Sequence, residues 1–262
     1  MDYNLRYVMY SMHNLYNYRK MYAKSVFFIF LLNIGSLSGG IHIIGDSHAA
    51  HCFSNNSGIS GHEESMFLYS HNVEMRVPFV IDYRTASMHG IGVGGLSSLN
   101  ISTLGAQDGD VCVFVYGEID ARMHIGRLRD EHQRDLNEML DALANDYMRT
   151  IIANKELLKD LTFVIVSVVP PATNEACQPN PTYPVYGVVE DRVDITKKLN
   201  MRLKALAEKN DFLFLDIYPL YADANGVLIY ALSDGHVHVN LNSNYRIKNA
   251  LIELLISKDI HW

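Results

Sequence analysis

The chain has 262 residues, of which 48% are hydrophobic and 19% are charged, and its formal net charge is −7. These values are typical of a globular protein with one large domain, or with one domain and an extension. The sequence contains no run of basic residues, which argues against a nucleic-acid-binding surface and against a polybasic membrane patch. Its three cysteines are widely spaced and indicate neither a disulfide framework nor a cysteine-based zinc site.

Residues 1–40 differ in composition from the rest of the chain. They begin with a tyrosine-rich stretch, after which the basic residues Arg19, Lys20 and Lys24 precede the apolar stretch 26–32. A basic flank, a short apolar stretch and small residues together resemble a secretory signal or a signal-anchor. The apolar stretch is far shorter than the ~20 residues of a membrane-spanning helix, and an extra buried strand or helix is the alternative.

The chain is therefore expected to have two parts, an N-terminal extension over 1–40 and a single domain over 41–262. The localisation stays open at this point. The protein is cytoplasmic, or it is secreted or membrane-associated if residues 19–40 act as a signal segment.

The first predicted strand is the apolar run 41–44, which breaks at Gly45-Asp46 and is followed by Ser47 at the expected start of a helix. Such a run is typical of a strand buried on both faces of a parallel sheet. A serine at its carboxyl end lies where open α/β sheets bind ligands and where free helix N–H groups stabilise negative charge. The alternative is that Asp46 or Ser47 serves only as a helix N-cap.

The rest of the chain alternates between predicted strands and predicted helices. Four further apolar runs predict strands over 77–83, 110–116, 161–169 and 212–216. Amphipathic spacing predicts helices over about 128–152, 195–206 and 243–256. The segment 48–75 is mixed and polar with loop signals, and the glycine-rich stretch 90–98 predicts a turn where backbone approaches a ligand closely. This alternation predicts a parallel sheet covered by helices.

Ser47 has a plausible set of catalytic partners near the other end of the chain, in the loop 233–240. A serine hydroxyl is a weak nucleophile at neutral pH, so it needs a histidine as general base and an acidic residue to orient that histidine. A histidine of this loop and Asp234 are suited to these two roles. Backbone N–H groups at Ser47 and in the turn at Gly94-Gly95 would then face the oxyanion, each contributing roughly 3 kcal/mol.

A two-metal phosphoesterase is the competing interpretation of the same residues. Asp46-Ser47-His48 and Gly235-His236-Val237-His238 contain pairs that are able to bind metal ions, and Gly117-Glu118-Ile119-Asp120 is a further acidic cluster. Two coordination spheres would need more histidine ligands from the middle of the chain. No histidine occurs between His132 and His236, so the sequence argues against this site.

In chain order, these residues resemble the four motif blocks of the SGNH/GDSL hydrolases. The blocks are Gly45-Asp46-Ser47-His48, the glycine-rich stretch that ends at Gly95, Gly117-Glu118-Ile119-Asp120, and Asp234 with His238-Val239-Asn240. The resemblance covers about residues 41–257. It implies a flavodoxin-like, three-layer α/β/α fold with about five central parallel strands, and a Ser-His-Asp hydrolase with no metal or organic cofactor. Family members include esterases, lipases, thioesterases and carbohydrate deacetylases, and the Gly-Glu-Ile-Asp-x-Arg form is similar to a subgroup associated with glycan modification.

Carried over by position, the resemblance implies a role for four residues. Ser47 would be the nucleophile and would also offer its N–H to the oxyanion hole. Gly95 would supply a second N–H, Asp234 would be the acid and His238 the base.

The sequence departs from the family pattern in two places. Ile119 stands where the third block normally has an asparagine that donates to the oxyanion, and the loss of such a donor costs about 10²–10³ in rate. Arg122 is a candidate replacement, unless it forms a salt bridge with Asp120 or Glu118. The Asp-x-x-His spacing is longer by one residue, which leaves His236 as the alternative base.

We therefore expect a serine esterase that removes an O-acyl group, such as acetyl, from a carbohydrate. Its partner would be a small-molecule or glycan ester, with no nucleic acid and no metal. The alternatives are an acyl- or glycosyltransferase on the same fold, and a non-catalytic glycan-binding protein on a degenerate SGNH scaffold.

Overall fold

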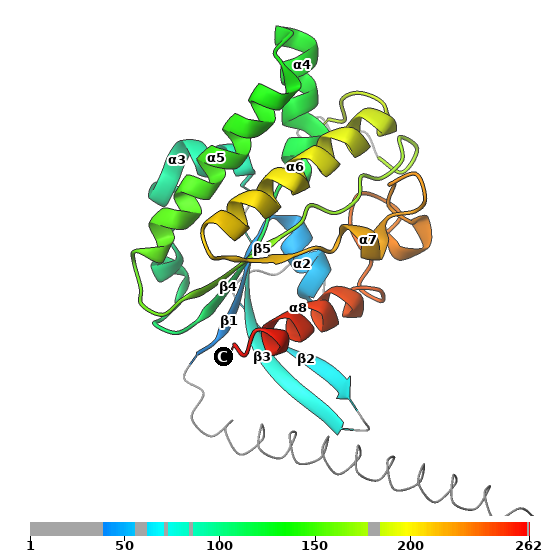
Figure 1. The fold of residues 1–262 in the computed structure, drawn as a ribbon. Helices are drawn as coiled ribbons and strands as arrows, with labels where there is room; N and C mark the ends of the chain where they lie inside the picture. The colour runs from blue at the N-terminus through cyan, green and yellow to red at the C-terminus, as the bar shows by residue number, and fades with distance from the viewer. Residues whose placement is uncertain (1–38, 56–61, 71–72, 84–85, 178–183, 261) are drawn as a thin grey trace, which may run out of the picture. The chain divides into compact units, whose positions relative to one another are not determined.

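The computed structural model describes residues 39–55, 62–70, 73–83, 86–177, 184–260 and 262 (Figure 1). All but the last two residues of the predicted N-terminal extension lie outside these ranges, so its role stays a prediction. Of the helices within the described ranges, none combines the length and the apolar character that crossing a membrane requires.

The centre of the fold is a sheet of six strands in the order β2-β3-β1-β4-β5-β6. The strands are β1 (Ile41–Gly45), β2 (His62–Ser70), β3 (Val73–Tyr83), β4 (Val111–Val115), β5 (Thr162–Val166) and β6 (Leu213–Leu215). The five strands from β3 to β6 are parallel, and β2 pairs with β3 in the antiparallel direction. The predicted parallel sheet of about five strands is confirmed.

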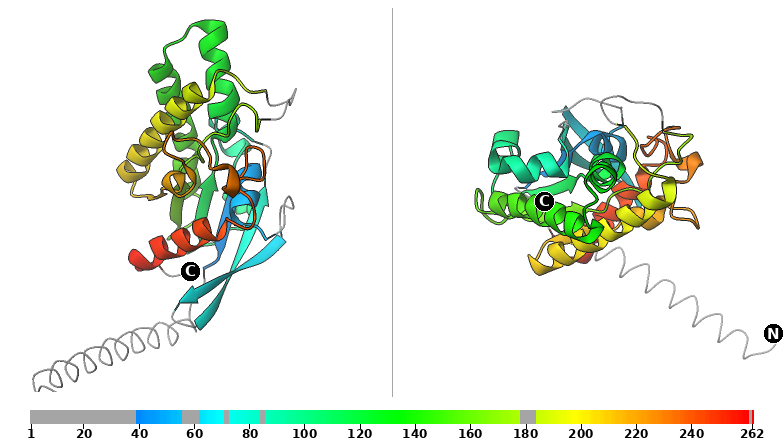
Figure 2. Two further views of the ribbon diagram at one scale, coloured as in Figure 1. Left: turned by 90° about the vertical axis from the view of Figure 1, so that its right-hand side faces the viewer. Right: turned by 90° about the horizontal axis from the view of Figure 1, so that it is seen from above.

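Helices cover both faces of this sheet (Figure 1 and Figure 2). They are α2 (Ser47–Phe53), α3 (Met88–Gly94), α4 (Ile125–His132), α5 (Leu136–Lys155), α6 (Val189–Lys209), α7 (Tyr218–Tyr221) and α8 (Tyr245–Ser257). Along β1, Ile44 belongs to the core under α3, α5 and α6, whereas Ile43 belongs to the core under α2 and α8. Because successive strand residues point to opposite faces and both faces are buried, the strand reads as a continuous apolar run. The three-layer α/β/α architecture is confirmed.

Strand β2 corrects the expectation of loops over 48–75. Residues 62–70 pair along their whole length with β3, with Ser65 opposite Pro78. Their mixed polar sequence carries no buried-strand signal, because the pairing depends on the backbone groups that β3 offers at its outer edge. The same pairing makes β3 longer than predicted, since it begins at Val73 and not near Pro78.

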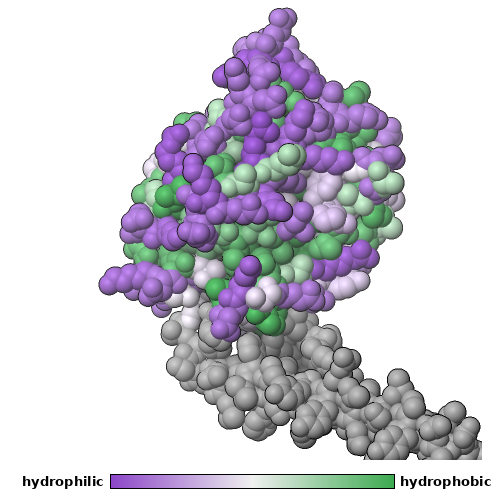
Figure 3. Space-filling view, in the orientation of Figure 1, coloured by the Kyte–Doolittle hydropathy of each residue, from purple (hydrophilic) through white to green (hydrophobic). Residues whose placement is uncertain are grey.

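The single helix predicted over 128–152 is two helices. Gln133 adopts a left-handed conformation (φ 50°) that ends α4, and the Asp135 side chain then accepts the N–H of Glu138 to begin α5. Helix α4 lies at the top of Figure 1, and Figure 3 shows it covered by hydrophilic residues. Its charged sequence therefore faces outward, whereas α5 buries one side against the sheet.

Gly45 lets the end of β1 pass close to its neighbours just before Ser47. A Cβ at this position would lie 2.6 Å from the Cβ of Ala49 and 3.0 Å from the Cβ of Val115, both of which are buried. Since real side chains do not pack at 2.6 Å, the turn that presents Ser47 requires a glycine here.

The substitution Gly45→Ala is expected to lower the free energy of unfolding by about 1–3 kcal/mol, because the added methyl overpacks this turn. Urea denaturation followed by circular dichroism measures the change. Gly90→Ala in α3 is the matched control, since its nearest atom beyond the helix backbone, Ser87 Oγ, would lie 3.6 Å away. That variant should gain up to about 1 kcal/mol from helix propensity. Equal effects of the two substitutions would contradict the argument.

Candidate active site

The carboxyl end of β1 leads directly into α2 and presents Ser47. Asp46 caps the helix, because its Oδ1 accepts the N–H of His48 at 2.8 Å, while its own N–H donates to Val115 O of β4. The capping role foreseen as an alternative for Asp46 or Ser47 therefore falls to Asp46. The Ser47 hydroxyl is left for another partner. As the first residue of α2, Ser47 also has an N–H with no acceptor inside the helix.

That partner is His238, from the loop before α8. Its Nε2 lies 2.9 Å from Ser47 Oγ, and its Nδ1 lies 3.0 Å from Asp234 Oδ2. An ionised carboxylate only accepts hydrogen bonds, so Nδ1 carries the proton and Nε2 accepts from the serine hydroxyl. The structure thus brings together Ser47, His238 and Asp234, in the order that the sequence analysis expected of a nucleophile, a base and an acid.

His236, the alternative base, is directed elsewhere. Its Nδ1 lies 3.3 Å from the carbonyl oxygen of Ala176, and its backbone N–H donates to Asp234 Oδ1 at 2.8 Å. The extra residue in the spacing is absorbed by the turn between Asp234 and His238, in which the Asp234 N–H donates to His238 O. The contact with Ser47 is made by His238.

Asp234 is held as an anion by this turn. Partial burial raises its pKa, but the hydrogen bonds from the His238 ring and from the backbone N–H of His236 outweigh burial and hold the pKa well below its usual range. Burial lowers the pKa of His238, which the hydrogen bond to Asp234 offsets only in part. His238 is therefore neutral at neutral pH, as a general base must be.

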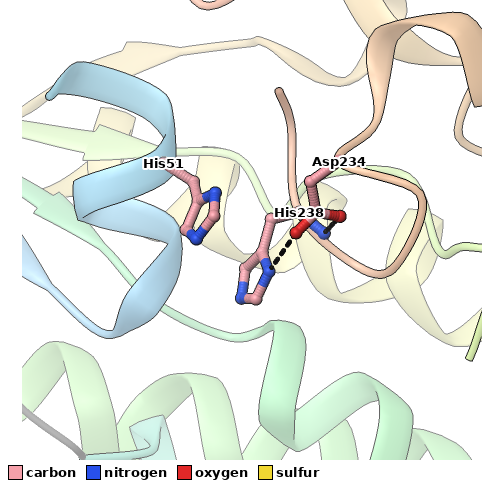
Figure 4. Close-up of side chains that lie close together, drawn as sticks. All are labelled: His51, Asp234 and His238. Atoms are coloured by element: carbon pink, nitrogen blue, oxygen red, sulfur yellow. Dashed lines mark hydrogen bonds and ion pairs between the residues drawn. The ribbon is translucent and has the colours of Figure 1, made fainter. Parts of the chain in front are cut away.

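His51 is a site residue that the sequence analysis did not identify. Its ring stacks on the ring of His238, with centroids 3.9 Å apart and planes 8° from parallel, and Figure 4 shows both beside Asp234. Burial and the neighbouring His238 and His48 lower the pKa of His51 to about 4. The stacked ring is therefore neutral at neutral pH. The available signal was its spacing, because a residue four positions after Ser47 lies on the same helix face.

His51, Asp234 and His238 also have potential metal-ligand atoms within 4.8 Å of one another. An imidazole nitrogen binds a metal ion along its lone pair, in the plane of the ring. The two rings are stacked and nearly parallel, so one ion cannot lie in both planes, and both nitrogens of His238 already face Asp234 and Ser47. The arrangement suits a general base better than a metal centre.

Within the motif Gly117–Arg122, Glu118 and Arg122 form a buried ion pair close to His48 and His238. Arg122 donates to both carboxylate oxygens of Glu118, at 2.6 and 3.0 Å. Burial alone would raise the pKa of Glu118, but Arg122 and then His48 hold it below its usual value. Arg122, the candidate oxyanion donor, thus forms the salt bridge to Glu118 that was the alternative. Ile119 is buried and offers no polar group.

Gly95 does not lie in the predicted glycine-rich turn. Residues 88–94 form helix α3, and the N–H of Gly95 donates to Ile91 O at its end, so this N–H is not available to an oxyanion. Gly92 serves packing, since a Cβ at this position would lie 2.8 Å from the Cβ of Asp146 in α5. The expectation of a backbone turn facing the ligand is therefore wrong. Small residues here allow two helices to approach closely.

Asp120 ties this helix to the end of β4. Its two oxygens accept the N–H groups of Met88 and His89 at 2.7 and 3.1 Å. Asp120 is fully buried, and desolvation raises its pKa to about 7 despite these two bonds.

Solved structures of the same fold occur at low sequence identity. A protein from Streptococcus pneumonia described as a platelet activating factor is 13% identical, with a TM-score of 0.52 over 85% of this chain and 86% of that chain. A catalytic mutant of an acetylxylan esterase from Geobacillus stearothermophilus is 13% identical, with a TM-score of 0.50 over 84% and 94% of the two chains. A protein from Desulfitobacterium hafniense described as lipolytic and of the G-D-S-L family is 10% identical, with a TM-score of 0.50 over 83% and 100%.

The chain shares the fold of these three proteins, one of which is described as belonging to the G-D-S-L family. The sequence itself has no significant similarity to any protein-family model or to any curated protein. The likeness to these proteins therefore lies in the three-dimensional arrangement of strands and helices. What the site does within that fold rests on its own residues.

The raised pKa of Asp120 predicts a pH-dependent stability. The folded state favours the protonated form, so the associated stability is fully present below the unfolded carboxyl pKa of about 4 and is lost as the pH rises through about 7. Asp120→Asn keeps an oxygen acceptor and cannot ionise. The free energy of unfolding of the natural protein, relative to this variant, should fall by on the order of 3 kcal/mol across that range. Urea denaturation at about pH 4.5, 6 and 7.5 measures it. A difference that is constant with pH would contradict the assignment.

Proposed function

We propose that this protein is a serine esterase in which Ser47 is the nucleophile, His238 the general base and Asp234 the acid. The observation that carries the proposal is the chain of contacts from Ser47 Oγ to His238 Nε2 and from His238 Nδ1 to Asp234 Oδ2. It lies at the carboxyl edge of a parallel sheet, where open α/β folds bind their ligands.

The reaction would proceed in two acyl-transfer steps. His238 Nε2 takes the Ser47 proton as Oγ attacks the acyl carbonyl carbon, and the resulting imidazolium is stabilised by Asp234. As the tetrahedral intermediate collapses, the carbon–oxygen bond to the alcohol breaks and His238 returns the proton to that alcohol. Water then attacks the acyl-Ser47 ester, His238 again takes and returns a proton, and the carboxylic acid leaves.

The oxyanion of each intermediate would be stabilised mainly by the N–H of Ser47. Neither Gly95, whose N–H bonds to Ile91 O, nor the apolar Ile119 supplies the other two donors of the family pattern. This scarcity of donors favours one alternative, a glycan-binding protein without turnover on the same scaffold.

The proposed substrate is an O-acylated carbohydrate, with acetyl as the acyl group. Two observations support it: the Gly-Glu-Ile-Asp-x-Arg form of the third block, and the acetylxylan esterase among the proteins that share the fold. A transferase that passes the acyl group to another acceptor would use the same first step, and would differ by releasing little free acid in the presence of that acceptor.

Labelling by a fluorophosphonate, mapped by mass spectrometry, tests the nucleophile without knowledge of the substrate. We expect the label on Ser47 and its loss in Ser47→Ala. Acetate release from acetylated xylo-oligosaccharides should fall by at least about 10³-fold in that variant. Retained binding to these sugars with no label on the natural protein would favour the glycan-binding alternative.

Two substitutions in one loop separate the base from its neighbour. His238→Gln should reduce the labelling rate and the turnover by at least about 10³-fold, because it removes the ring nitrogen that contacts Ser47 Oγ and would accept its proton. His236→Gln should retain most of both, since its contribution to Asp234 comes from the backbone N–H. Comparable losses in the two variants would contradict the assignment of His238.

A further inference from the structure

His48 follows the proposed nucleophile and has a hydrogen-bond acceptor on each side of its ring. Its Nδ1 lies 3.1 Å from Asp46 Oδ1, its Nε2 lies 3.3 Å from the carbonyl oxygen of Val237, and the side chain is buried. A carbonyl oxygen and an ionised carboxylate only accept hydrogen bonds. Both ring nitrogens must therefore donate, and the ring that does so is an imidazolium.

The contacts of Asp46 are those of a hydrogen-bond acceptor. Its Oδ1 already accepts the backbone N–H of His48 at 2.8 Å. Among the residues that the structure describes, Oδ2 is buried and has no hydrogen-bond partner, so a proton there would have no acceptor. An ionised Asp46 without a cation beside it would be a costly buried charge, which the His48 imidazolium offsets.

The charged and titratable groups around the ring are consistent with this state. Asp46 from the end of β1 and Glu118 from the end of β4 favour the cation, whereas His51 in α2 and His238 in the C-terminal loop oppose it. Burial lowers the pKa of His48, but the two carboxylates and the Val237 carbonyl outweigh burial and raise it above its usual value.

The two bonds join parts of the chain that are far apart in sequence. Asp46 belongs to the turn that presents Ser47, and Val237 directly precedes His238. A ring that holds both therefore sets the distance between the serine hydroxyl and the imidazole that would activate it. We propose, on the basis of the serine esterase function above, that His48 is a positioning residue that links these two segments as a doubly protonated, buried cation.

The same cation acts on His238, whose ring centroid lies 4.7 Å away. A positive charge at this distance disfavours protonation of His238 and keeps it available as a base at lower pH. His48 would thus act on the reaction twice, through the geometry of the loop and through the acidity of its neighbour.

Nitrogen-15 NMR of the histidine-labelled full chain tests the protonation state directly. The His48 signals are assigned by their loss in His48→Asn. We expect both ring nitrogens of His48 to be protonated at about pH 7.5, well above the ordinary histidine pKa of about 6.5. One unprotonated ring nitrogen would overturn the proposal. Because this readout needs no activity, it stands even if the protein proves not to be an esterase.

Kinetics on an acetyl ester test the positioning role. His48→Asn and His48→Gln should lower kcat/KM by about 10- to 100-fold. They should also move the acidic limb of its pH profile upward by about one unit, since removing the cation raises the pKa of His238. Glutamine places its amide near the Nε2 position and keeps a donor for Val237 O, so it should retain more kcat than asparagine.

His42→Asn is the matched control, because His42 is also a buried histidine paired with an aspartate, Asp110, at 2.9 Å, but at the opposite end of β1. It should cost stability without moving the pH profile. The proposal would be overturned if the His48 variants left the pH profile of kcat/KM unchanged. It would also be overturned if His42→Asn shifted that profile by the same amount. Failure of the fluorophosphonate to label Ser47 in the natural protein would instead contradict the esterase function.

Discussion

The hydrogen bond between Ser47 Oγ and His238 Nε2 joins the first strand of the sheet to the loop before the last helix. Ser47 is placed by β1, which lies between β3 and β4 with both faces buried, and by the close turn at Gly45. His238 is held within its loop by the hydrogen bond to Asp234. Just after the loop, Asn244, at the start of α8, donates to His51 O and Ser54 O at the end of α2. Ser47 and His238 are therefore held by connected elements, although they come from opposite ends of the domain.

Buried charge is the second constraint on this region. Glu118 and Arg122 neutralise each other in a two-bond ion pair, and Asp46 is paired with His48. Asp120 forms no ion pair with a residue that the structure describes, so it depends on backbone N–H groups and on a proton. A charge removed from water must be paired with an opposite charge or neutralised by a proton. Glu118 and Asp46 are paired, whereas Asp120 is protonated more readily. The result is a set of fixed charges directly behind a more exposed serine, histidine and aspartate.

The departures from the sequence predictions have a common physical origin. The predictions for Gly95, Arg122 and strand β2 were made from local sequence. In the structure, the hydrogen bonds of each are made with another residue or strand of the chain. Gly92 lies where α5 leaves no room for a side chain, Arg122 is held by Glu118, and β2 pairs with the outer edge of β3. His51 was missed for the same reason, since a histidine on a helix face becomes part of a site only when another ring stacks on it.

The sequence by itself determined the fold class and indicated the candidate residues of the site. Continuous apolar runs such as 111–115 are typical of a strand covered on both faces, and Gly45-Asp46-Ser47 marks the end of such a strand. Only the tertiary structure decided that His238 and not His236 meets Ser47, that the N–H of Gly95 is already used, and that His48 spans two segments. These outcomes depend on distances between residues far apart in the chain, and such distances are set by packing and loop closure, which a one-dimensional pattern does not contain.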